Sequence, residues 1–105
     1  MENLKPLLDF FEAIQNDFRI SPSHIAIYTA LLQYRAKNGL ENYIQVYRHD
    51  ITPIAKISSP YTYHKCVQQL HDYGYLIYEP SFKKTQGSKI YFTIEKEIIT
   101  KQKPI

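Results

Sequence analysis

The stretch from residue 51 to residue 76, ITPIAKISSPYTYHKCVQQLHDYGYL, decides the fold. Its apolar spacing predicts a short helix, a tight turn and a longer helix over residues 60–73. Ser59 suits the N-cap position, Pro60 is tolerated in the first turn, and Gly74 suits the end of the helix. Two helices joined by such a turn form a helix-turn-helix.

The spacing also divides both helices into an inner and an outer face. We expect the short helix to start at Asp50 or Thr52, with Pro53 in its first turn. Its expected inner positions are Ile51, Ile54, Ala55 and Ile57. In the longer helix they are Tyr63, Val67, Leu70 and Tyr73 or Gly74, with Cys66 at the margin.

The next stretch, LIYEPSFKKTQGSKIYFTI over residues 76–94, predicts two strands joined by a tip rich in lysine, glycine and serine. Pro80 ends the first strand. In the second strand, expected over residues 89–95, buried Ile90, Phe92 and Ile94 alternate with Tyr91 and Thr93. Gly87 is expected to make the tip flexible. We expect this hairpin to lie beside the longer helix as a β-wing.

Upstream, an amphipathic helix is expected over residues 4–18, with a stripe of Leu4, Leu7, Phe11, Ile14 and Phe18. Leu8 and Phe10 broaden that stripe, and two interpretations remain open: the helix covers its own core, or it pairs with a second copy of the chain. A central helix is expected from Ser21-Pro22 to about Lys37, ended by Asn38-Gly39. A short strand is expected over residues 43–47.

Composition limits the classes of protein that fit. A chain of 105 residues with 44% hydrophobic residues is the size of one domain. Residues 1–18 carry one lysine against four acids, net −3, whereas residues 80–105 carry six lysines against two acids, net +4. One cysteine excludes an intramolecular disulfide, and no membrane span or signal peptide is expected, so the expected location is the cytoplasm.

These residues resemble the winged-helix DNA-binding domains of MarR-like transcriptional regulators and of small replication or mobile-element regulators. Ile54-Ala55 looks like the Leu-Ala pair of the first motif helix, and Ser59 resembles the residue that starts the recognition helix. Further positions that match the family pattern are Thr62, Tyr63, Lys65, Val67, Leu70 and Gly74. The chain departs from that pattern in having Tyr63 where the family has an aliphatic residue, and in having one lysine and no arginine in this helix.

The resemblance covers roughly residues 21–95 and implies a mainly helical α+β fold. That fold is a winged helix-turn-helix with a small antiparallel β-wing. An extra N-terminal helix in residues 1–20 would precede it as a possible dimer contact, and a flexible tail over residues 96–105 would follow.

The expected DNA-binding positions lie on the outer face of the longer helix and on the wing. In the helix, Lys65 suits guanine or phosphate, Gln68 suits adenine, and Thr62 suits phosphate or a thymine methyl group. The candidates in this region are Ser59, Tyr61, Thr62, His64, Lys65 and Gln68, and Gln69 is also expected to face outward. On the wing they are Lys83, Lys84, Gln86, Ser88 and Lys89, which would contact the phosphate backbone or the minor groove. An ordinary solvated surface is the alternative for both groups, and for Arg48 the choice between phosphate contact and surface solubility is even.

The sequence argues against catalysis, and we expect no cofactor. His24, His49, His64, His71 and Cys66 do not have the spacing of a structural zinc site. Cys66 lies near the expected inner face rather than in an exposed electropositive site, which argues against a nucleophile. The chain also lacks a glycine-rich phosphate loop.

The sequence therefore favours a non-catalytic protein that binds double-stranded DNA, with residues 60–73 in the major groove and residues 80–89 on flanking backbone. A homodimer formed by the N-terminal helix would read a two-fold site. Two alternatives remain open: a winged-helix module for protein interaction or replication assembly without sequence-specific DNA binding, and an accessory subunit of an enzyme.

Overall fold

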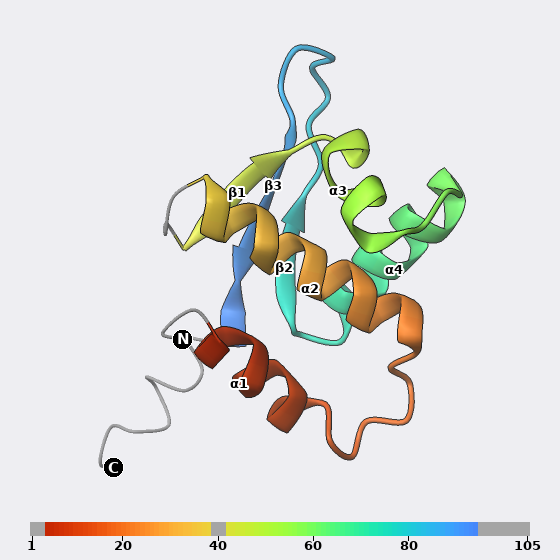
Figure 1. Ribbon diagram of the computed structural model, residues 1–105. Helices are drawn as coiled ribbons and strands as arrows, with labels where there is room; N and C mark the ends of the chain where they lie inside the picture. Colours follow the sequence, from red (N-terminus) through yellow and green to blue (C-terminus); the bar gives the residue numbers. More distant parts are fainter. Residues whose placement is uncertain (1–3, 39–41, 95–105) are drawn as a thin grey trace.

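The computed structural model describes residues 4–38 and 42–94 and shows a mainly helical α+β protein. In chain order the elements are α1 (Lys5–Ala13), α2 (Pro22–Lys37), β1 (Tyr43–Val46), α3 (Arg48–Ala55), α4 (Pro60–Asp72), β2 (Leu76–Glu79) and β3 (Ser88–Phe92). Helix α2 occupies the middle of the helical layer and contacts α1, α3 and α4 (Figure 1). The expected flexible tail, residues 96–105, lies outside the described residues.

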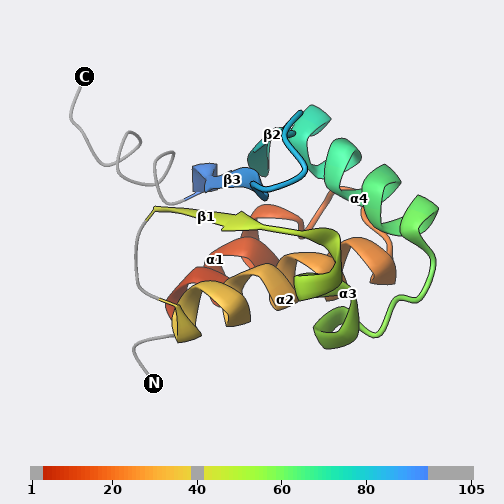
Figure 2. The ribbon, with the colours of Figure 1, turned by 90° about the horizontal axis from the view of Figure 1, so that it is seen from above.

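The three strands form one antiparallel sheet in the order β1-β3-β2. Ile90 of β3 pairs with Ile44 of β1 and with Tyr78 of β2, which fixes the register across the sheet. Ile90 and Phe92 are buried, as the alternation predicted. One face of the sheet lies over α2, and α4 flanks β2 (Figure 2).

Helix α4, the longer helix of the predicted pair, agrees with its prediction. Ser59 caps α4 by accepting the backbone N–H of Thr62 at 3.2 Å. Tyr63, Val67 and Leu70 are buried, and Cys66 is buried with them rather than at the margin. Gly74 follows the helix with a φ of +90°, a conformation that glycine adopts without steric cost.

The prediction for α3, the shorter helix of the pair, was wrong in its start and in its inner face. Helix α3 begins at Arg48, earlier than expected, because the Asp50 carboxylate accepts the backbone N–H of Tyr47 at 2.8 Å and closes the first turn. Ile51 and Ala55, four residues apart, form its buried face. Ile54 is therefore turned about a quarter of the helix circumference away, and its side chain is 40% exposed.

The N-terminal helix also differs from its prediction. Helix α1 ends at Ala13, and the buried positions are Phe10 and Ile14, whereas Phe11 is exposed. Phe10 determines this orientation because its ring stacks on that of Tyr28 in α2, with centroids 3.9 Å apart. The expected last member of the stripe, Phe18, lies in the connection to α2 with its side chain 97% exposed.

Candidate nucleic-acid interface

Helix α4 is attached to the rest of the molecule by side-chain hydrogen bonds in addition to its buried face. Gln69 Oε1 lies 2.8 Å from Nε2 of the buried His24 in α2. Because His24 Nδ1 accepts the backbone N–H of Ser21 at 2.9 Å, we assign the ring proton to Nε2, which donates to Gln69. His71 Nδ1 accepts the backbone N–H of Tyr78 in β2 at 3.1 Å. The expectation that Gln69 faces outward was therefore wrong.

The exposed residues of α4, apart from Pro60 at its start and the acid Asp72 at its end, form a single stripe. Tyr61, His64, Lys65 and Gln68 stand at i, i+3, i+4 and i+7, so they share one side of the helix, and all four are exposed. We call these four residues the α4 stripe. They offer hydroxyl, imidazole, ammonium and amide groups, all of which can form hydrogen bonds with a ligand.

The remaining helix candidates are more constrained. Ser59 is half-buried and uses its hydroxyl in the cap, and Thr62 is half-buried beside the stripe. Within the stripe, Gln68 Nε2 donates to Asp72 Oδ1 at 3.1 Å, and this hydrogen bond is exposed. The Lys65 ammonium lies 5.9 Å from the centroid of the Tyr61 ring. Lys65 therefore brings the positive charge of the stripe near the first turn of α4.

The second group of candidates lies at the hairpin between β2 and β3, which projects beyond the sheet past the end where β1 leads into α3 (Figure 1). We call residues 80–87 the β2–β3 loop. Lys83, Lys84 and Gln86 are exposed in it. The Gln86 backbone N–H donates to the Lys83 carbonyl at 3.1 Å, so the tip has a turn of its own.

Ser88 and Lys89 lie at the base of the hairpin, in β3. The Ser88 hydroxyl accepts the backbone N–H of Ser81 at 3.4 Å and closes the base of the loop. The Lys89 ammonium lies 5.8 Å from the centroid of the Tyr43 ring on the sheet. These two candidates are thus separated from the lysines of the tip.

Gly87 does not provide the flexibility that was expected of it. It is buried, and a Cβ at this position would lie 2.6 Å from main-chain atoms of Val46 in β1. Gln45 Nε2 also donates to the Gly87 carbonyl at 3.1 Å. Gly87 therefore permits a close approach of two backbones and fixes the hairpin to β1.

Sequence reasoning gave no weight to Arg48 and did not select Lys56 or Phe82. Arg48 is exposed at the first residue of α3, and Lys56 is exposed in the turn before α4 with a φ of +62°. Phe82 is exposed in the β2–β3 loop. A large apolar residue inside a polar, lysine-rich loop was the one available signal, and it was visible in the sequence.

Tyr63 links these parts electrostatically. Burial raises the pKa of its hydroxyl, as do Tyr78 and the Asp50 carboxylate, while the Arg48 guanidinium opposes the shift. The first turn of α3 is therefore close enough for its charges to act on the inner face of α4. Burial also raises the pKa of the Cys66 thiol, against the effect of Lys65, which suits a core residue rather than a nucleophile.

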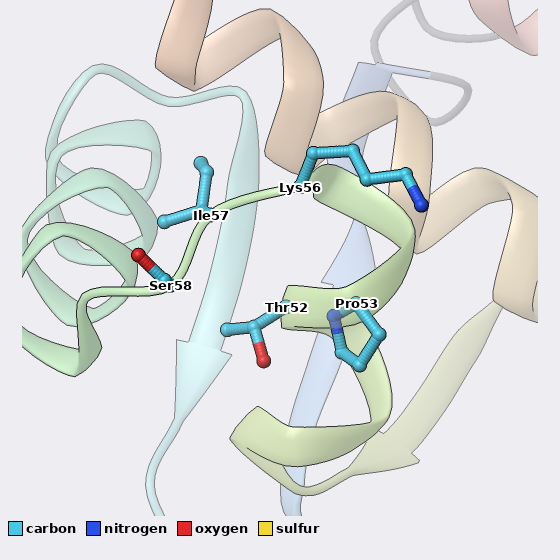
Figure 3. A pocket seen from close by; sticks show the side chains of 5 residues that line it. All are labelled: Thr52, Pro53, Lys56, Ile57 and Ser58. Atoms are coloured by element: carbon cyan, nitrogen blue, oxygen red, sulfur yellow. The ribbon is translucent and has the colours of Figure 1, made fainter.

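An open hollow lies on the surface at the turn between α3 and α4 (Figure 3). Its lining residues are Thr52, Pro53, Lys56, Ile57 and Ser58. The Lys56 side chain extends away from those of Ile57 and Ser58, so the hollow itself is lined mainly by apolar and hydroxyl groups (Figure 3).

Over residues 4–38 and 42–94, no group of three or more His, Cys, Asp or Glu side chains is placed to hold a metal ion. No helix in the same part of the chain is long and apolar enough to cross a membrane. Comparison of the chain with protein-family models, with curated proteins and with solved structures finds no match.

Proposed function

We propose that this protein binds double-stranded DNA as a winged helix-turn-helix and acts as a regulator of transcription. In this proposal α4 is the recognition helix, its stripe enters the major groove, and the β2–β3 loop is the wing on flanking backbone. The observation that carries the proposal is the α4 stripe itself. Four exposed side chains able to read bases share one side of a helix whose opposite side is buried and whose two flanks are held by Gln69 and His71.

The distribution of exposed cations supports the same partner. Arg48, Lys56 and Lys65 belong to the two motif helices and their turn, while Lys83 and Lys84 project on the hairpin. A phosphate backbone is a polyanion, and contacts from several such cations release its condensed counterions. The β2–β3 loop contains no acid that would oppose this attraction.

The test is a titration of labelled random-sequence duplex DNA, followed by anisotropy, at two salt concentrations. We expect binding at low salt that weakens steeply as salt rises, because counterion release supplies most of the non-specific free energy. Absence of binding at low salt would overturn the proposal. It would favour the interaction or assembly module that uses the same fold.

We further propose that α1 pairs with a second copy of the chain, so that two α4 helices meet a two-fold DNA site. Leu4, Leu8 and Phe11 stand on one side of α1, and all three are exposed. Lys5 and Glu12 lie on one flank of that stripe. In an antiparallel pair of α1 helices, Lys5 of each copy lies against the partner's Glu12. These two opposite-charge pairs favour self-association through this face.

Because Phe10 belongs to the core, a deletion of α1 would damage the fold as well as this face. A better test is Leu8→Glu, since the Leu8 side chain is 60% exposed. We expect Leu8→Glu to halve the mass in sedimentation at micromolar concentration. Ala13→Glu, also exposed but on the opposite side of α1, is the control that leaves the mass unchanged. A wild-type protein that sediments as a monomer would refute the pairing.

A further inference from the structure

The β2–β3 loop presents an aromatic ring to solvent. The Phe82 side chain is 98% exposed, the largest value among the exposed large hydrophobic side chains of the described residues. Single exposed apolar residues are common and mean little on their own. Phe82 differs from such residues in how its backbone is held and in the charges that surround it.

Hydrogen bonds hold the backbone on both sides of Phe82. The Ser81 hydroxyl accepts the backbone N–H of Lys83 at 3.1 Å and contacts the Lys83 carbonyl at 3.2 Å. The Lys83 carbonyl also accepts the backbone N–H of Gln86. With the base of the loop closed by Ser88 and Gly87 fixed against β1, the ring is directed outward by a defined turn.

The positive charge around the Phe82 ring favours an anionic partner. Lys83 and Lys84 follow Phe82 directly, both are exposed, and no acid occurs within the loop. Two cations beside an outward aromatic ring suit a ligand that combines anionic groups with a stack of flat apolar faces. Duplex DNA is such a ligand, and apolar side chains inserted between base steps from the minor groove are a known way of bending it.

We infer that Phe82 inserts as a wedge between two adjacent base pairs, while Lys83 and Lys84 contact the phosphates on either side. This inference rests on the proposed DNA-binding function and adds a mode of recognition to it. Pyrimidine–purine steps unstack most readily, so the wedge favours such a step beside the sequence that the α4 stripe reads. The loop thereby contributes sequence preference without contacting a base edge.

The chain contains no tryptophan, so a single introduced indole is a unique reporter. Phe82→Trp reports on the loop, and Phe18→Trp is the matched control. Phe18 is 97% exposed and belongs to the connection between α1 and α2. That connection lies at the opposite end of the molecule from the hairpin (Figure 1). We expect saturating duplex DNA to quench the Phe82→Trp emission and to protect it from acrylamide, and to leave the Phe18→Trp emission unchanged.

A second measurement separates the wedge from the lysines. Phe82→Ala should weaken duplex binding on the order of tenfold, because one aromatic–base stack is lost. The salt dependence should keep its slope, because no charge is removed. Bending can be measured by energy transfer in a duplex that carries a donor dye at one end and an acceptor dye at the other. The wild-type protein and Phe82→Leu should bend this duplex, and Phe82→Ala should leave it straight.

The outcomes distinguish the two proposals. Binding by anisotropy without quenching of Phe82→Trp, or with unchanged affinity in Phe82→Ala, overturns the wedge and leaves the DNA-binding function intact. Absence of both binding and quenching overturns both. A blue shift of the Phe82→Trp emission with phosphatidylserine vesicles, but no response to DNA, would overturn the wedge and assign the loop to an anionic lipid surface.

Discussion

The α4 stripe and the β2–β3 loop differ in how they are held and in what they offer a ligand. The stripe stands on a helix whose other side is buried and whose flanks are hydrogen-bonded to α2 and β2, and Lys65 supplies its one formal positive charge. The loop projects from the sheet, is fixed at its base, and carries two adjacent lysines. Under the proposed function, this difference assigns the reading of base edges to the stripe, and it assigns most of the affinity, together with the step preference of Phe82, to the loop.

The largest expected effect on this comparison comes from the loop. Lys83→Ala combined with Lys84→Ala should weaken binding on the order of 50-fold at about 0.1 M salt, because two phosphate contacts are lost. The slope of log K against log salt should become shallower by about 2. Anisotropy titrations over a range of salt concentrations measure both quantities.

The control for this double variant removes an exposed lysine elsewhere, Lys37→Ala. We expect it to retain nearly all of the affinity and nearly the whole slope. A loss per lysine as large as that of the double variant would mean that overall charge, rather than the loop, drives binding.

The next effect concerns how firmly the stripe is held. Gln69→Ala removes the acceptor of the buried His24 Nε2–H, and an unsatisfied buried donor costs roughly 1–3 kcal/mol. We expect the free energy of unfolding in urea to fall by about that amount. Gln68→Ala, one residue away on the exposed stripe, should change it by less than about 0.5 kcal/mol. Equal values for the two variants would show that the bond to His24 does not anchor α4.

A smaller effect shows whether Lys65 contacts a base edge or only the phosphate backbone. Lys65→Ala should weaken specific binding on the order of tenfold, about 1.4 kcal/mol. If the ammonium contacts a guanine, the loss should vary when that base pair is replaced, whereas the loss from the loop lysines should be uniform across sequences. Competition among duplexes that differ by one base pair measures this, and a uniform loss would reassign Lys65 to the backbone.

Local rules were sufficient for the elements in which the sequence pattern and the packing agree. Ser59, Gly74 and the spacing of Val67 and Leu70 predicted α4 and its buried face, because a cap, a terminator and a helical period act within a few residues of the chain. The alternation of Ile90 and Phe92 predicted the buried face of β3 for the same reason.

The failures occurred where a distant contact decides a local orientation. The stacking of Phe10 on Tyr28 turns α1 away from its expected stripe. Gln69 is drawn inward by His24, which is 45 residues away in the sequence. Periodicity within one segment contains no information about either partner. The conformation of the β2–β3 loop was likewise not predictable, since it depends on the close approach of Gly87 to β1.

The last prediction concerns the end of the molecule away from the stripe and the loop. Asp17 accepts two bonds from the Arg19 guanidinium, each 2.8 Å long, and one from the Tyr75 hydroxyl at 2.5 Å. These bonds from Arg19 and from Tyr75 hold the pKa of Asp17 well below its ordinary value of 3.8. Burial and the bond to Asp17 raise the pKa of Tyr75 to about 12.

The sign of each pH dependence follows from these shifts. The unfolded chain takes up a proton at Asp17 near pH 3.8, whereas the folded protein does so at a lower pH, so this stabilisation is present above that range and is lost as the pH falls. For Tyr75 the folded value is the higher one, so its stabilisation is present below pH 10 and is lost as the pH rises toward 12. Urea midpoints at several pH values should therefore show an acid loss of stability. Asp17→Asn should abolish that loss, and Asp9→Asn, which removes the partner of the exposed Lys5, should retain it. The cluster contains no residue of the stripe or the loop, although Arg19 stacks on Tyr73 at the C-terminal end of α4, 4.0 Å from the ring centroid. Asp17→Asn should therefore leave DNA affinity at neutral pH unchanged. A marked loss of affinity would mean that this cluster controls the position of α4.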